Sequence, residues 1–93
     1  MSCYPYAMHN DECWDRERML RAVASRIATD LHALELSNIA ILLENAILSG
    51  EPIVPAMRRT ESEIYSVAGV HPWRHELVSV ARRSDFMLLK AEY

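Results

Sequence analysis

The fold is decided by the stretch from Leu20 to Gly50, which reads LRAVASRIATDLHALELSNIAILLENAILSG. At helical spacing, its apolar side chains form one stripe before Ser37 and a second stripe after it. The first stripe consists of Leu20, Val23, Ile27, Leu31 and Leu34, and the second of Ile39, Leu42, Leu43, Ala46 and Ile47. The linker between them is only a few residues around Glu35 and Leu36, which suits two helices folded back on one another as an αα-hairpin. We therefore predict an all-α fold built on this hairpin.

The composition agrees with helices. With 93 residues the chain is long enough for one domain, and it is 51% hydrophobic with only two glycines and four prolines. This profile favours helices over a turn-rich β-sandwich. We expect a compact bundle of four or five helices, made of an N-terminal arm (residues 1–10) and a single helical domain (residues 11–93).

Helix boundaries follow from capping residues. We expect the first helix over Asp11–Leu34 and the second over Ser37–Ser49, with Ser37 as the N-cap of the second helix. Gly50 is suited to the left-handed conformation that ends a helix.

The second half of the chain contains two further helix signals. Thr60 to Glu63 spells a Thr-x-x-Glu capping box, which predicts a short helix ending at Gly69. A final helix is expected over Pro72–Lys90, because proline is favoured at the first helical position. We interpret Glu51–Arg59, which contains two prolines, as a connector.

Burial should be greatest at the apolar positions of these stripes: Val23, Ile27, Leu31, Ile39, Leu42, Leu43, Ile47, Ile64, Leu77 and Val80. The second helix is apolar on more than one side, because Ile39–Leu43 is a continuous apolar run. Such a helix is expected either at the centre of the fold or at an oligomer interface. The continuous run Phe86–Leu89 carries the same implication.

The charge balance limits the partners. The formal net charge is -3, so the whole molecule is not expected to be attracted to a polyanion. Lys90 is the only lysine, and every other basic residue is an arginine. Arginine suits carboxylates, phosphates and interfaces, although arginine-rich codon usage would give the same bias.

The first functional hypothesis is a small noncatalytic interaction protein, a regulator, adaptor or inhibitor that docks on a larger protein. Its basis is a surplus of apolar residues flanked by arginines and aromatics, the residue types of interface anchors. A second copy of the chain is a further candidate partner. The residues expected to contact the partner are Tyr4, Tyr6, Trp73, Arg74, Arg82, Arg83 and Phe86.

The alternative hypothesis is a DNA-binding regulator that uses residues 60–83. Glu63–Val70 resembles the first helix and turn of a helix-turn-helix, in which the next helix enters the major groove. That resemblance implies DNA contacts from Arg58, Arg59, Trp73, Arg74, Arg82 and Arg83.

Catalytic and cofactor signatures are missing from the sequence, which has no glycine-rich phosphate loop, no Gly-x-Ser-x-Gly and no His-Glu-x-x-His. We expect no enzyme and no cofactor. His71 and His75 lie one helical turn apart, and Cys3, His9 and Cys13 could complete a zinc site. Without a Cys-x-x-Cys pair, however, no metal site is predicted.

The start of the chain shows no secretory signal, and the longest apolar stretch, Ile39–Leu48, is interrupted and too short to span a bilayer. We therefore expect a cytoplasmic protein without a membrane partner, in which Cys3 and Cys13 are thiols.

Overall fold

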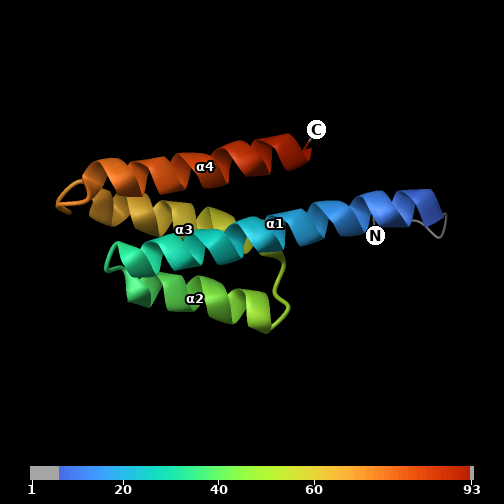
Figure 1. Cartoon of the computed structure of the whole chain (residues 1–93), viewed down its shortest axis with the longest axis horizontal. Helices are drawn as coiled ribbons and strands as arrows, with labels where there is room; N and C mark the ends of the chain where they lie inside the picture. Colours follow the sequence, from blue (N-terminus) through green and yellow to red (C-terminus); the bar gives the residue numbers. More distant parts are fainter. Residues whose placement is uncertain (1–6, 93) are drawn as a thin grey trace.

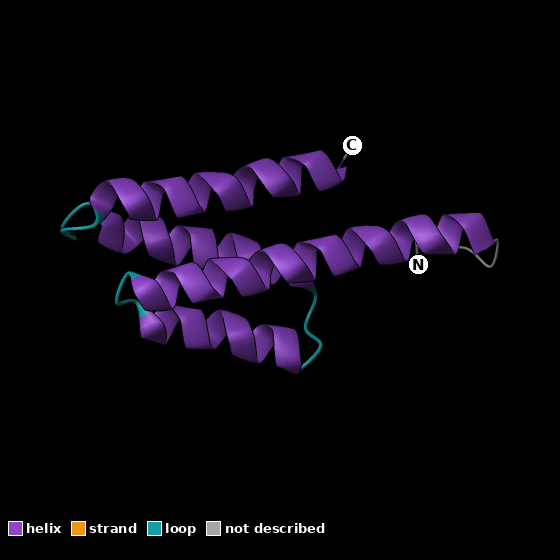
Figure 2. Cartoon of the chain, viewed as in Figure 1, coloured by secondary structure: helices purple, strands orange, loops and turns teal. Residues whose placement is uncertain are grey.

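The computed structural model describes residues 7–92, with side chains described for residues 16–90. This part of the chain forms four helices and no strand: α1 (Ala7–Ala33), α2 (Ser37–Leu48), α3 (Ile53–Ala68) and α4 (Arg74–Glu92) (Figure 2). The all-helical class is confirmed, with four helices. Tyr4 and Tyr6 of the predicted arm lie outside the described residues.

Successive helices run antiparallel and are joined by short turns, and the N-terminal part of α1 extends beyond the other helices (Figure 1). α1 packs against α2, α3 and α4, and α3 also packs against α2 and α4. α2 and α4 do not approach each other within the described chain. The bundle is therefore flattened, with α1 and α3 in the middle and α2 and α4 at opposite edges.

The core lies between the packed sides of the helices, with α1 and α3 in the middle. Its largest fully buried side chains are Leu20, Ile27, Leu31, Leu43, Ile53, Met57, Ile64, Leu77 and Leu88. Most of the predicted core residues are buried, and Val23 and Ile47 are partly buried. Leu42 is the exception, because it is 62% exposed. The predicted burial of Leu42 was wrong because α2 lies at an edge of the bundle, where only the side toward α1 and α3 is covered.

The end of α1 is set by a left-handed residue. Glu35 has a φ of 66°, and the N–H of Leu36 donates to the carbonyl of Leu31 at 2.8 Å. The N–H of Glu35 donates to the carbonyl of His32 at 3.1 Å. These two bonds form a Schellman motif, which turns the chain into α2 while satisfying carbonyls at the end of the helix.

α2 ends in the same way, as Gly50 predicts. Gly50 has a φ of 77°, and its N–H donates to the carbonyl of Ile47 at 3.3 Å. The N–H of Glu51 donates to the carbonyl of Ala46 at 3.1 Å. At the start of α2, Ser37 is the first helical residue and not the N-cap, which is Leu36, and no side chain caps this end. The Ser37 hydroxyl instead lies 2.9 Å from Nδ1 of His32.

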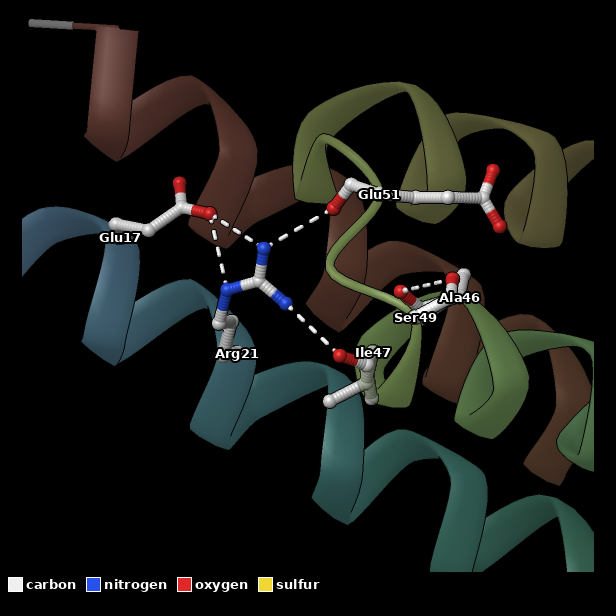
Figure 3. A network of polar contacts seen from close by, with 6 residues as sticks. All are labelled: Glu17, Arg21, Ala46, Ile47, Ser49 and Glu51. Carbon is white, nitrogen blue, oxygen red and sulfur yellow. Dashed lines mark hydrogen bonds and ion pairs between the residues drawn. The ribbon is translucent and has the colours of Figure 1, made fainter.

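An arginine from α1 holds the end of α2 in place (Figure 3). Arg21 donates from Nη1 to the carbonyl of Ile47 at 3.3 Å and from Nη2 to the carbonyl of Glu51 at 3.0 Å. Its Nε donates to Oε1 of Glu17 at 3.0 Å. One guanidinium thus joins α1 to the last turn of α2 and to the turn that leads into α3. Its positive charge is also stabilised by the negative C-terminal end of the α2 helix dipole.

The predicted connector over Glu51–Arg59 is wrong, because residues 53–59 belong to α3. α3 is a single helix of 16 residues that begins at Ile53, well before the predicted start at Thr60. Pro55 is its third residue, and N–H groups in the first turn have no partner within the helix, so proline removes no bond there. Thr60 is buried in mid-helix, and its hydroxyl donates to the carbonyl of Ala56 at 2.9 Å.

Two other boundaries also differ from the prediction. α1 begins at Ala7 and not at Asp11, so residues 7–10 of the predicted arm are helical. Ala7 and Met8 are both good helix formers, which favours this earlier start. α4 begins at Arg74 and not at Pro72, and the carbonyl of Trp73 accepts the N–H of Leu77 at 2.9 Å.

Candidate protein-interaction surfaces

The outward side of α4 combines arginines with apolar side chains. Positions four residues apart lie on one side of a helix, which brings Arg74, Val78, Arg82 and Phe86 into a row, with Leu89 beside them. We call these five residues the α4 face. Phe86 is 59% exposed and Leu89 is 43% exposed, whereas Val78 is partly buried. Nζ of Lys90 lies 5.5 Å from the centre of the Phe86 ring, a cation–π contact.

The arginines of the described chain divide into two groups. Five of them lie within salt-bridge distance of a carboxylate: Arg21, Arg26, Arg58, Arg59 and Arg83. For the other four, no carboxylate lies within that distance among the described residues: Arg16, Arg18, Arg74 and Arg82. A cleft of about 490 Å³ is lined by Arg74 and Arg82 of this group, together with His75, Val78 and Ser79. The α4 face therefore offers two exposed cations beside apolar surface.

The other predicted contact residues have different positions. Arg83 pairs with Asp30 of α1, and this ion pair links α4 to α1. Trp73 is 45% exposed and lies in the turn before α4. Arg83 is therefore engaged within the molecule, while Trp73 borders the α4 face.

The residues predicted to bind DNA lie on α3, on α4 and in the turn between these helices. α3 and α4 lie side by side and antiparallel (Figure 1), whereas the two helices of that motif cross at about 90–120°. α3, which has 16 residues, packs against α4. Arg58 joins the two helices by donating to Oδ1 of Asp85 at 2.8 Å, and Arg59 lies 3.5 Å from Oε1 of Glu51.

A second surface, which the predicted contact residues did not include, covers the outward side of α2. It consists of Asn38, Ile41, Leu42, Asn45 and Leu48, which we call the α2 face. Leu48 is 85% exposed, Leu42 62% and Ile41 48%, and no residue of this face carries a charge. The signal in the sequence was the continuous run Ile39–Leu43, which a helix at the edge of a bundle cannot bury on every side.

Shallow clefts border the α2 face on both sides. Between α1 and α2, a cleft of about 460 Å³ is lined by Ser25, Ile41 and Leu48 among others. Between α2 and α3, a cleft of about 440 Å³ is lined by residues that include Leu42 and Asn45. Side chains of another molecule could enter both clefts while covering the helix between them.

One buried carboxyl group lies apart from both surfaces. Glu61 is 7% exposed, and its Oε2 has no hydrogen-bond partner among the described residues. Nη1 of Arg58 is 3.6 Å from this oxygen. Burial raises the pKa of Glu61, the charge of Arg58 opposes that rise, and the charge of Asp85 adds to it.

The structure brings no cluster of metal ligands together among its described residues, where no group of three or more His, Cys, Asp or Glu side chains could hold a metal ion. Nδ1 of His71 accepts the backbone N–H of Trp73 at 3.1 Å. Cys3 and the side chains of His9 and Cys13 lie outside the described residues.

Among residues 7–92, no helix combines the length and the apolar character that a membrane-spanning segment needs.

Comparisons with known proteins give no relative for this chain. No protein-family model, no curated protein and no solved structure matches it.

Proposed function

We propose that the protein is a small noncatalytic interaction module, a regulator, adaptor or inhibitor that docks on a larger protein through the α4 face. The observation that carries this proposal is the position of Arg74 and Arg82 beside exposed Phe86 and Leu89 on one side of α4. Like Arg16 and Arg18 of α1, these two arginines have no carboxylate within salt-bridge distance among the described residues. Arginine beside exposed aromatic and aliphatic side chains is the composition typical of interface hot spots.

The same geometry defines the chemistry of the partner. Arg74 and Arg82 are separated by two helical turns, which is about 12 Å along α4. A docking segment that places two carboxylates at this separation, with an apolar residue between them to contact Val78, would satisfy both guanidiniums. Its continuation would cover Phe86 and Leu89. A cytoplasmic location, as expected from the sequence, remains part of the proposal.

The test is capture of partners from the native host with immobilised protein in three forms. The wild type and the R16E/R18E variant should retain the same partner, whereas the R74E/R82E variant should lose it. The control pair has the same change in charge, but Arg16 and Arg18 are exposed residues of α1. Loss in both variants would indicate nonspecific charge attraction, and equal capture by all three forms would contradict the use of the α4 face.

DNA is the alternative ligand, and the same variants test it. A salt titration with duplex DNA should show no binding beyond weak, nonspecific affinity at low ionic strength, because the net charge is -3. Tight duplex binding that the R74E/R82E variant loses would replace the protein partner with DNA.

A further inference from the structure

The cleft on α4 is lined almost entirely by hydrogen-bond donors. Its lining consists of Arg74, His75, Val78, Ser79 and Arg82, which we call the α4 cleft. Two guanidiniums, an imidazole and a hydroxyl thus surround one apolar side chain, and each of these four groups can donate. Among the described residues, no carboxylate lines this cleft. Such a lining favours an anion that accepts several hydrogen bonds at once.

The hydroxyl of Ser79 and the imidazole of His75 are available to a ligand. The hydroxyls of Thr29 and Thr60 donate to carbonyls one turn earlier in their own helices, and that of Ser49 donates to the carbonyl of Ala46. Within the described part of the chain, neither Ser79 nor His75 has a side-chain hydrogen-bond partner of this kind. Both groups therefore keep their donors for a molecule that enters the α4 cleft.

Helical geometry places the four donors around one point. His75 and Arg82 are seven residues apart, which is about 10.5 Å along the axis and within about 20° of the same side of α4. Val78 and Ser79 lie between them, one on each side. Arg74 and Arg82 are each four residues from Val78, about 6 Å along the axis, a distance that an extended arginine side chain spans. An anion over the middle of the α4 cleft is therefore approached from both ends and from one flank.

The carboxylates nearest to the α4 cleft are directed elsewhere. Asp30 and Glu76 line a neighbouring cleft between α1 and α4. Asp30 pairs with Arg83, and Asp85 pairs with Arg58 at 2.8 Å. The α4 cleft therefore carries local positive charge although the chain as a whole is acidic.

We propose that the α4 cleft binds the phosphate group of a phosphorylated side chain on the protein partner. This inference rests on the proposed docking of a partner on the α4 face, and it identifies the anion that the partner presents. A phosphate monoester carries a charge of about -1.5 to -2 and three strong acceptor oxygens, so one group can engage both guanidiniums, the imidazole and the hydroxyl. A pair of carboxylates would engage Arg74 and Arg82 but leave His75 and Ser79 unused.

The apolar end of the α4 face favours a phosphorylated peptide segment over free phosphate. Phe86, which is 59% exposed, lies seven residues beyond Ser79, about 10.5 Å along α4 and on nearly the same side. An extended segment covers that distance in about three residues. An apolar residue three positions from the phosphorylated one would therefore contact Phe86 while the phosphate occupies the α4 cleft. Inorganic phosphate would gain nothing from that contact.

The direct test is calorimetric titration of the full chain with short peptides at about pH 7.5, where the phosphate is a dianion. The probe peptide has one phosphoserine with a leucine three positions to either side, in a background of glycine and serine, so that it fits in either direction. It should bind at least about tenfold more tightly than the same peptide with serine or glutamate in place of phosphoserine. A Glu-x-x-x-Glu peptide, whose carboxylates are about 13 Å apart when extended, is the carboxylate-pair control and should bind more weakly than the phosphopeptide.

Variants separate the contributions of the donors. R74Q/R82Q should remove the preference for phosphoserine, whereas R16Q/R18Q, which neutralises two exposed arginines of α1, should leave it unchanged. S79A should weaken phosphopeptide binding about threefold and leave the Glu-x-x-x-Glu peptide unaffected, because only the phosphate uses the hydroxyl. F86A should weaken the phosphopeptide but not inorganic phosphate. Far-UV circular dichroism of each variant checks that the helices are retained.

Equal binding of the phosphoserine and serine peptides would overturn the proposal, as would a phosphate preference that R74Q/R82Q retains. If inorganic phosphate competes as well as the phosphopeptide, or F86A has no effect, the ligand is free phosphate and not a phosphorylated segment. Phosphatase treatment of the host extract distinguishes this inference from the proposed function. Partner capture that R74E/R82E loses but phosphatase leaves unchanged contradicts the phosphate alone, whereas capture that R74E/R82E retains contradicts the use of the α4 face itself.

Discussion

Arg21 should contribute more to stability than an arginine that contacts only its own helix. It lies in the middle of α1, yet its guanidinium donates to the carbonyls of Ile47 and Glu51, which are 26 and 30 residues away. We predict that R21A destabilises the protein by about 2 kcal/mol. Its removal should loosen the end of α2 first.

The magnitude follows from three contacts. Each hydrogen bond from Arg21 to a carbonyl is charge-assisted but only partly buried, with the side chain 28% exposed, and should contribute about 0.5–1 kcal/mol. The ion pair with Glu17 is separated by four residues on one helix and should add less than about 0.5 kcal/mol. In R21A the carbonyl of Ile47 retains the N–H of Gly50, and the carbonyl of Glu51 accepts its bond at an exposed site that water can reach. Neither loss buries an unpaired acceptor, so the total stays near 2 kcal/mol.

The assay is urea unfolding followed by circular dichroism, at about 5 μM protein so that association does not add to the measured free energy. E17Q removes only the ion pair and should cost less than about 0.5 kcal/mol, and R21K should fall between E17Q and R21A. Hydrogen exchange of the amides of Gly50 and Glu51 should accelerate in R21A. If R21A lies within about 0.5 kcal/mol of the wild type, or E17Q is as harmful as R21A, the Arg21 bridge is not stabilising.

Three further predictions concern single residues. Glu35 has a positive φ of 66°, so E35G should stabilise the protein by about 1 kcal/mol in urea unfolding, and a loss of stability would contradict the left-handed assignment. G50A should have the opposite effect, about 1 kcal/mol of destabilisation, since the φ of Gly50 is 77° although the space around it is open. The pKa of Glu61 is raised in the folded state, so its contribution to stability is greatest when the carboxyl is protonated and declines as pH rises through the raised pKa. E61Q should therefore be at least as stable as the wild type at neutral pH, with an advantage that shrinks toward about pH 4, and an advantage that grows on acidification would show that the sign is wrong.

Helical periodicity was sufficient to predict much of the fold, because the stripes through Ile27, Leu31 and Leu43 are buried as predicted. Local capping signals were less reliable. The Thr-x-x-Glu pattern at Thr60 has the composition of a helix start, but the preceding residues also bury Ile53 and Met57 in the core, and this packing carries the helix through Thr60. Tertiary packing thus outweighed a local preference worth about 1 kcal/mol.

The candidate surfaces were only partly predictable for a different reason. Exposure of Arg74, Arg82 and Phe86 follows from their spacing along one helix, but whether an arginine is paired depends on residues far away in sequence. Arg83 pairs with Asp30, 53 residues earlier, whereas its neighbour Arg82 does not. No pattern within α4 alone distinguishes these two adjacent arginines.

The topology of the bundle decides between two interpretations of the apolar run in α2. The apolar run Ile39–Leu43 predicts either a central helix or a helix at an oligomer interface. In the bundle, α2 packs against α1 and α3 but not α4, so it is an edge helix, and Ile41, Leu42 and Leu48 remain exposed. A central position in the fold is therefore excluded for α2. The spacing within the run does not show which side α1 and α3 cover, because that depends on helices that lie elsewhere in the sequence.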